Sequence, residues 1–528
     1  MFNILNKKRG IQEFKSIFYV NPRPQLVELP DLKDKENFNI KYALIEPFVN
    51  AHIFWDKENN ELVYYVEEPV LDGKEKETLD ILESGINELI NISFISVKST
   101  GAVIEYLEKN IRVLLSELKI AISRESFLKL MYYIYRNFVG LNEIEPLLKD
   151  YYIEDIECNG VNTPIYIVHR KYRNLRTNII YNDTKKLTRF VEKLAQRSGK
   201  YISYATPLLD SSLPDNTRVN AVYTQDIASR GPSFTLRRFT KEPWTPVKLM
   251  QFKTVSPEML AYLWLLIENG ANIMIIGATA SGKTSFLNSI AFFIPPAARV
   301  VSIEDTKEIN LMHENWLPGV IREGIGMTNL VGTKEGDITL FDLLKESFRQ
   351  RPDYVIVGEI RGKEAYVLFQ GMSSGHPSMG TMHAEDVETM IRRLETPPIE
   401  LSSSLVESLD VVCVITQAKF QNNDVRRIRE IVEIVKVNET SGKAETNTPF
   451  VWDPRTDKFY FKENSVILSK IVTQKGISKE KLEKEFRLRT KLLMALYNRN
   501  IIGFKEVNDV INAYYKTPEF VLKRFNIS

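Results

Sequence analysis

The chain has 528 residues, 44% of them hydrophobic and 26% charged, which predicts a soluble globular protein of about three or four structural units and excludes disordered and collagen-like classes. Seventy basic and sixty-eight acidic side chains give a net charge of +2. This balance gives no support to wholesale nucleic-acid binding, although local patches are compatible with it.

The cysteine content and the hydropathy pattern indicate the compartment. Cys158 and Cys413 lie far apart and show no C-x-x-C spacing, so neither a disulfide scaffold nor a thiolate zinc site is expected. Residues 1–10 lack the long apolar segment of a secretion signal, and the sequence contains no run of about 18 apolar residues. We therefore expect a cytoplasmic protein whose association with a membrane depends on a partner.

Residues 1–150 are predicted to contain two parts. Residues 1–40 are polar and dotted with prolines, and we expect them to form a flexible, poorly packed arm. In residues 41–150, strand-like alternation at 51–55 and 61–66 predicts a hairpin, and apolar positions at helical spacing from about residue 74 onward predict several packed helices.

Residues 151–243 combine strand and helix patterns. Apolar stretches at 164–168 and 218–222 predict strands, and a helix is expected near 185–196. Together these elements predict an α+β domain. Residues 243–246 include two prolines that interrupt the pattern, so we place a linker there.

Apolar, strand-like runs alternate with helical stretches over residues 244–445. This alternation predicts a doubly wound parallel sheet and hence an α/β fold. The five strand candidates are 272–276, 299–303, 354–358, 411–416 and 428–436. Residues 446–528 are predicted to form a hairpin and a helical C-terminal subdomain.

The most informative motif follows the first of these strands. A G-x-x-x-x-G-K-T string begins directly after the apolar run 273–276, and glycines at both of its ends let backbone N–H groups wrap phosphates at a helix N-terminus. Lys283 would reach the β- and γ-phosphates of a nucleoside triphosphate, and the Thr284 hydroxyl is suited to Mg²⁺. The alternative is a glycine-rich turn with a solvated lysine. The expected nucleotide-binding residues are Gly277, Ala278, Thr279, Ala280, Ser281, Gly282, Lys283, Thr284 and Ser285.

Two groups of acidic residues follow apolar strands downstream of this loop. Glu359 comes after 354–357, and Glu304 with Asp305 comes after 300–303, with Glu308 close behind. In an open α/β sheet the carboxyl ends of the strands form the edge where ligands bind. Hydrolysis of a phosphate bond needs such carboxylates to orient water or to hold the metal. The alternative for Glu359 is a solvated carboxylate that caps a helix.

Three of the five histidines lie in this half of the chain. His376 and His383 fall within one short glycine-containing segment, where an imidazole could hydrogen-bond a phosphate. His313 is isolated, and a lone histidine is more often structural. A zinc site is the competing interpretation, but the spacing offers no convincing third ligand.

These motifs together resemble the four boxes of the type II/type IV secretion ATPase superfamily. In that family's order, the boxes are the phosphate loop (Walker A), 303–308 (aspartate box), 357–362 (Walker B) and 375–384 (histidine box). The likeness continues upstream through 213–220 and 230–238, so that it covers at least residues 150–440. The segments 155–160 and 164–166, with Tyr514, Tyr515 and Pro518, resemble the archaeal branch of the superfamily.

The resemblance implies a RecA-like P-loop motor domain, an α+β (PAS-like) N-terminal domain, and a homohexameric ring whose domains close around Mg-ATP. Such a ring would act, at the inner face of the cell membrane, on a polytopic membrane platform protein that feeds pilin-like subunits into a filament. Archaellum, adhesive pilus, DNA-uptake pilus and secretion all remain open at this stage. No stable nucleic-acid binding is expected.

The resemblance also implies residue roles. Lys283 and Thr284 would hold phosphate and Mg²⁺. Glu304 would polarise the attacking water and Glu359 would support metal or water, and these two assignments could be exchanged. His383 resembles the family's nucleotide-sensing histidine. Arg218 and Arg237 match N-terminal-domain arginines that reach the γ-phosphate on closure, with surface salt bridges as the alternative.

The sequence departs from known patterns at two points, and two alternative functions remain open. No acid stands immediately before Gly358 and Glu359, which is normal for this superfamily but abnormal for most P-loop enzymes. The four-cysteine zinc module of many bacterial type II secretion ATPases is missing, which argues against that subtype. The alternative functions are a RecA-like nucleic-acid motor, which should carry a basic groove with stacking aromatics, and an assembly scaffold that binds ATP without hydrolysing it.

Overall fold

The structure is a computed structural model that describes residues 17–20, 27–30, 32, 34–89, 100–238, 242–322, 324, 335–421, 423–437, 444–462 and 464–527. Most of the predicted arm, residues 1–40, lies outside these ranges. The chain divides into two compact units, Met1–Phe239 (unit 1) and Thr240–Ser528 (unit 2). The finer division into five parts stays a proposal.

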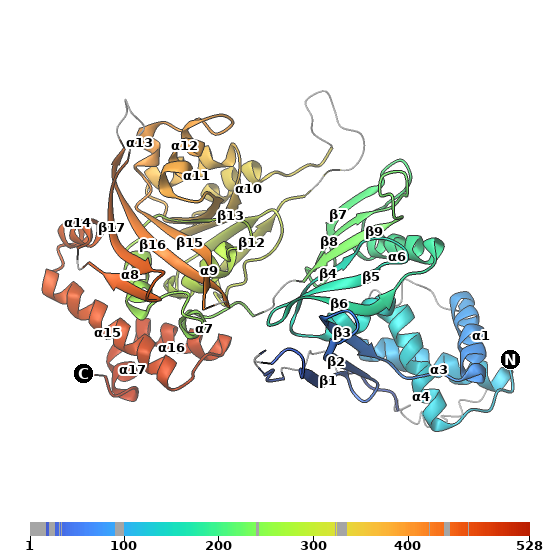
Figure 1. Ribbon diagram of the computed structural model, residues 1–528. Coiled ribbons are helices and arrows are strands. Elements are labelled where there is room, and N and C mark those ends of the chain that lie inside the picture. Colours follow the sequence, from blue (N-terminus) through green and yellow to red (C-terminus); the bar gives the residue numbers. More distant parts are fainter. Residues whose placement is uncertain are drawn as a thin grey trace, which may run out of the picture. The chain divides into compact units, whose positions relative to one another are not determined.

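Unit 1 is built on one sheet of nine strands in the order β1-β2-β3-β6-β5-β4-β9-β8-β7 (Figure 1). The predicted hairpin is confirmed, because β2 and β3 pair antiparallel. Strand β3 also pairs in parallel with β6, so that the hairpin and the strands beyond residue 150 share this sheet. The strands are β1 (Asn39–Ile45), β2 (Val49–Asp56), β3 (Glu61–Glu67), β4 (Ile153–Cys158), β5 (Pro164–His169), β6 (Arg173–Ile180), β7 (Leu208–Ser212), β8 (Arg218–Val222) and β9 (Ser233–Arg237).

The helices expected between about residue 74 and residue 150 and near residue 190 are confirmed. Two of them begin at good caps: the Ser123 side chain accepts from the backbone N–H of Ser126, and the Asp183 side chain accepts from that of Lys185. The helices of unit 1 are α1 (Gly73–Leu89), α3 (Thr100–Glu117), α4 (Arg124–Ile134), which continues as a π-helical turn (Tyr135–Val139), α5 (Glu145–Lys149) and α6 (Thr184–Arg197).

Part of the predicted arm is packed against the core, contrary to our expectation, although Ile17 and Tyr19 are exposed. Phe18, Val20 and Leu29 are buried in the core of unit 1. The carboxylate of Glu108 on α3 accepts the backbone N–H of Ile17 at 3.1 Å. Burial of three apolar side chains, which composition alone does not reveal, holds these residues against the unit.

Unit 2 contains a second nine-stranded sheet in the order β12-β11-β13-β14-β10-β15-β16-β17-β18. The first six strands run parallel, and β15 to β18 form an antiparallel meander. All five predicted segments are strands, but 428–436, expected in the parallel sheet, lies in β16, which runs antiparallel to β15. Strands β12 and β14 were not predicted. The strands are β10 (Ile273–Gly277), β11 (Val300–Glu304), β12 (Trp316–Val320), β13 (Tyr354–Ile360), β14 (Ser378–His383), β15 (Val411–Phe420), β16 (Asn423–Val437), β17 (Ala444–Asp453) and β18 (Lys458–Phe461).

Helices cover both faces of this sheet (Figure 1). Along β10, Ile273 and Ile275 face one hydrophobic cluster while Met274 and Ile276 face another, as expected for a parallel strand buried on both sides. The second cluster lies under α10 (Leu340–Ser347), α11 (Glu364–Ser373), α12 (Val387–Glu395) and α13 (Ser403–Val406). The first lies under α7 (Pro246–Gln251), α8 (Pro257–Glu268), α9 (Lys283–Ile290), α14 (Val466–Lys475), α15 (Lys479–Asn498), α16 (Phe504–Lys516) and α17 (Pro518–Arg524).

The helical C-terminal tail is confirmed, and its tyrosines have a structural role. Tyr514 packs its ring against Trp264 of α8, and Tyr515 accepts a hydrogen bond from the Trp264 indole at 2.9 Å. Tyr515 in turn donates to the backbone carbonyl of Phe293 at 2.6 Å. Among the helices that the structure describes, none is long and apolar enough to cross a membrane.

Candidate active site

The loop between β10 and α9 has the backbone that a phosphate cradle requires. Gly282, immediately before α9, adopts a left-handed conformation with φ 98°, which glycine reaches without strain. A Cβ on Gly277 would lie 2.3 Å from the backbone oxygen of Ile415 on β15, so only glycine fits there. The loop therefore delivers the N–H groups of the α9 N-terminus to one point at the carboxyl end of the sheet.

Two side chains of this loop fit an anionic ligand. The ammonium of Lys283 lies 3.1 Å from Gly277 O and 3.0 Å from Ala278 O. Burial lowers the pKa of Lys283. The buried hydroxyl of Ser281 has no hydrogen-bond partner within the described part of the chain, and a phosphate oxygen would satisfy this donor. Thr284 follows Lys283 on the first turn of α9, at the sheet edge that carries the acids.

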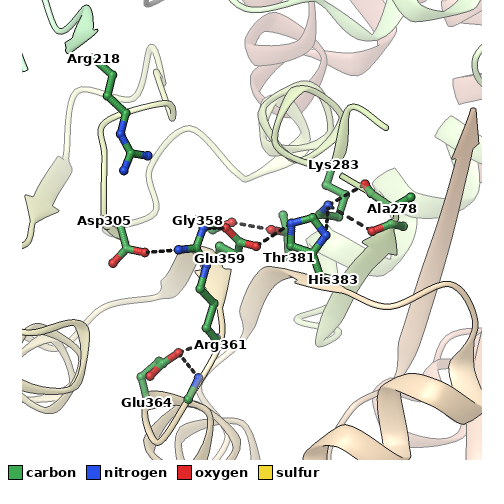
Figure 2. A network of polar contacts seen from close by, with 12 residues as sticks. Arg218, Ala278, Lys283, Asp305, Gly358, Glu359, Arg361, Glu364, Thr381 and His383 are labelled. Carbon is green, nitrogen blue, oxygen red and sulfur yellow. Dashed lines mark hydrogen bonds and ion pairs between the residues drawn. The ribbon is translucent and has the colours of Figure 1, made fainter. Parts of the chain in front are cut away.

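His383 connects Lys283 to the Walker B strand. It ends β14, which lies between β10 and β13, and it stands opposite Gly277 in the register. Its Nδ1 lies 3.2 Å from the Lys283 ammonium, and its Nε2 lies 3.0 Å from Glu359 Oε1 (Figure 2). Burial, and then the charge of Lys283, lower the pKa of His383. Because an ammonium can only donate, Nδ1 is the acceptor in the contact with Lys283 when the imidazole is neutral, and in that tautomer Nε2 carries the proton on the side of Glu359.

Arg361 links Glu359 to the acidic residues that follow β11. The second carboxylate oxygen of Glu359 contacts the guanidinium of Arg361, which lies 3.7 Å from Asp305 Oδ2. Figure 2 shows the resulting row of contacts from Lys283 through His383 and Glu359 to Arg361 and Asp305. The row therefore links the phosphate loop to both acidic groups that the sequence singled out.

The position before Glu359 lies close against the side chain of Glu304. At Gly358 a Cβ would lie 3.0 Å from Glu304 Cγ, a distance at which the Glu304 side chain would have to shift. A larger residue at position 358 would therefore press on the carboxylate side chain of Glu304.

Glu304 is the most deeply buried acid of the site. Its Oε1 accepts the backbone N–H groups of Glu308 at 2.9 Å and Ile309 at 2.8 Å. Its Oε2 is buried and has no hydrogen-bond partner among the residues that the structure describes. Burial raises the pKa of Glu304 from 4.5 to about 7. One oxygen is thus anchored, while the other is suited to take up a proton near neutral pH.

Not every predicted site residue lies in the row of Figure 2. His376 precedes β14, and its ring packs against that of Phe348 with centroids 5.1 Å apart. His313 lies 3.2 Å from the backbone oxygen of Ile294. Because His383 is the last residue of β14, the length of this strand separates it from His376. Of the three histidines, His383 is the one that contacts the phosphate loop.

Arg218 and Arg237 belong to unit 1, where they stand opposite each other on β8 and β9. Arg218 Nη2 lies 3.0 Å from Asp210 Oδ2, and Arg237 Nε lies 3.1 Å from Asp155 Oδ1. The two guanidinium groups are thus carried by neighbouring strands of one sheet.

Sequence reasoning gave Arg361 no role, although it stands only two residues after Glu359. The available signal was a cation in the turn that follows the Walker B strand. Its link to Asp305 was not predictable, because that contact joins residues 56 positions apart in the chain.

Comparisons with known proteins agree with the motifs. Residues 139–455 match the family model described as Type II/IV secretion system protein. An uncharacterized protein of Methanocaldococcus jannaschii is 35% identical over 96% of this chain and 95% of its own length. The type IV secretion system protein PtlH of Bordetella pertussis is 26% identical over 43% of this chain and 74% of its own length. The X-ray structure of the Yersinia pseudotuberculosis ATPase DotB is 17% identical, covers 70% of this chain and 91% of its own, and has a TM-score of 0.39.

Proposed function

This chain belongs to the type II/IV secretion system protein family and is a P-loop ATPase with a RecA-like α/β unit, and we propose that it works as a homohexameric Mg-ATP-driven motor that assembles a type IV pilus-like filament. The filament would be an archaellum or an adhesive pilus, or the motor would serve a type II-like secretion system. The observation that carries the proposal is the convergence of Lys283, His383, Glu359 and Glu304 at one edge of the sheet.

Lys283 and the loop N–H groups would bind the β- and γ-phosphates of ATP. To do so, the ammonium would exchange the carbonyl oxygens of Gly277 and Ala278 for phosphate oxygens, which carry more negative charge. Thr284 and Glu359 would hold Mg²⁺, which supplies charge neutralisation on the phosphates when it is bound.

Glu304 is our proposed acceptor for the proton of the attacking water. Its pKa of about 7 matches the requirement for a base that works near neutral pH. The exchanged assignment, with Glu359 as the base, remains the alternative, because Glu359 lies at the same edge of the sheet. The experiment that separates them is the pH profile of the two glutamine variants.

His383 is placed to report the state of the nucleotide. When Lys283 moves onto a phosphate, its contact with Nδ1 weakens, and the contact of Nε2 with Glu359 is free to change with it. The imidazole would therefore transmit the presence of the γ-phosphate to the Walker B acid.

We further propose that Arg218 and Arg237 reach the γ-phosphate when the N-terminal domain closes. Their guanidinium groups share one register position, so both would arrive together. Their ion pairs with Asp210 and Asp155 are partly exposed and therefore weak, so exchanging them for a phosphate costs little.

The motor would act at the inner face of the cell membrane through a polytopic platform protein, and would move pilin-like subunits only indirectly. Family membership supports this placement. The net charge of +2 offers no support for the alternative of a nucleic-acid motor.

The proposed function is tested in the native host by replacing the gene with a Lys283→Ala version. We expect cells to lose one class of surface filament, counted by electron microscopy, while a Lys345→Ala strain keeps it, since Lys345 is exposed on α10. Unchanged filaments together with loss of a secreted protein would assign the motor to secretion. Unchanged filaments and unchanged secretion would contradict the proposal.

A further inference from the structure

Arg361 stands on a turn whose backbone is held in place. Glu364, the first residue of α11, is 9% exposed, and its Oε1 accepts the backbone N–H groups of Arg361 at 2.6 Å and Gly362 at 2.7 Å. This carboxylate at the start of a helix also suits the helix dipole. The turn therefore fixes the point from which the Arg361 side chain extends.

The guanidinium of Arg361 joins the two acidic clusters. Nη2 contacts Glu359 Oε2 on β13, and Nη1 lies 3.7 Å from Asp305 Oδ2, just after β11 (Figure 2). The contact with Glu359 raises the pKa of Arg361. The side chain is 61% exposed, so it can leave this position without opening the core.

We propose that Arg361 competes with the divalent cation for the carboxylates of Glu359 and Asp305. This inference rests on the proposed role of Glu359 as a metal ligand. A cation of charge +2 and a guanidinium repel each other when they share one carboxylate. Metal alone would therefore bind weakly. The added negative charge of a triphosphate would offset the repulsion, so that metal and nucleotide bind together.

The test measures binding of Mn²⁺ alone, by electron paramagnetic resonance on the full chain without added nucleotide. Arg361→Gln removes the competing charge, and we expect Mn²⁺ to bind roughly three- to tenfold more tightly than to the wild type. Arg361→Lys keeps the charge, and its affinity should stay near the wild-type value.

The matched control is Arg392→Gln, which removes an exposed arginine paired with Glu388 on α12. Unchanged Mn²⁺ binding in this control, with tighter binding in Arg361→Gln, supports the proposal. Unchanged or weaker binding in Arg361→Gln overturns it, as does an equal gain in the control, which would show a general charge effect. This measurement needs no turnover. Mn²⁺ binding can therefore contradict the role of Arg361 while the chain still hydrolyses ATP, and it can support that role even if the proposed function is wrong.

Discussion

Replacing Lys283 with alanine is expected to reduce phosphate release from ATP by at least about a hundredfold. The β- and γ-phosphates would lose the ammonium that the loop directs to the edge of the sheet, where charge develops in the transition state. The alanine would also break the link to His383 at 3.2 Å. The measurement is phosphate release at matched protein concentration, with the oligomeric state of both proteins determined in parallel.

Lys345→Ala is the control for this substitution, because it removes an exposed lysine of the same unit. Its turnover should equal that of the wild type. Normal turnover in Lys283→Ala would remove the basis of the motor interpretation, whereas full loss of turnover in the control would point to a general loss of charge or of assembly.

Glu304→Gln is expected to lower kcat by about a hundredfold or more, while ATP binding is retained. The amide keeps the shape of the side chain and can still accept the N–H groups of Glu308 and Ile309, but it cannot take up a proton. Turnover and equilibrium ATP binding, measured on the same preparation, separate the two effects.

The pH dependence of turnover tests whether Glu304 acts as the base. A base must be ionised to accept a proton, and the pKa of Glu304 is about 7. Wild-type kcat/KM, which reports the groups of the nucleotide-free enzyme, should therefore fall as the pH drops through about 7, and at pH 6 about a tenth of these side chains would be ionised. Glu304→Gln should lose this limb. Persistence of the limb in Glu304→Gln, with its loss in Glu359→Gln, would exchange the two roles.

Folding provides an internal check on the same variant. A carboxyl group whose pKa is raised by burial stabilises the fold below its unfolded pKa, and that contribution is lost as the pH rises through about 7. Glu304→Gln should therefore become more stable relative to the wild type as the pH rises from about 4.5 to about 8. Thermal unfolding at both pH values measures this difference. If Glu304→Gln is inactive but shows this gain in relative stability, its loss of activity does not come from unfolding.

The phosphate loop and five of the nine strands of unit 2 were predictable because their signals are local. Apolar runs such as 273–276 predict strands buried on both faces, and the G-x-x-x-x-G-K-T string sets its own backbone geometry. Glu304 and Glu359 were placed at one edge by a topological rule about parallel strands, without any knowledge of their contacts.

Features that depend on distant residues were not predictable. Phe18 packs against Phe48 and Tyr135, which lie far along the chain, and the parallel pairing of β3 with β6 joins segments more than a hundred residues apart. Strand β14 was missed because its segment contains Gly380 and follows Gly375 and Pro377, residue types that are depleted in strands. The raised pKa of Glu304 comes from burial, which no spacing reveals.

The most direct test of the account is a structure of the chain with Mg²⁺ and a non-hydrolysable ATP analogue. The account predicts that the Lys283 ammonium leaves Gly277 O and Ala278 O for the terminal phosphates, with Glu304 and Glu359 facing the γ-phosphate. A nucleotide bound elsewhere, or a Lys283 still on its backbone carbonyls beside the bound analogue, would contradict it.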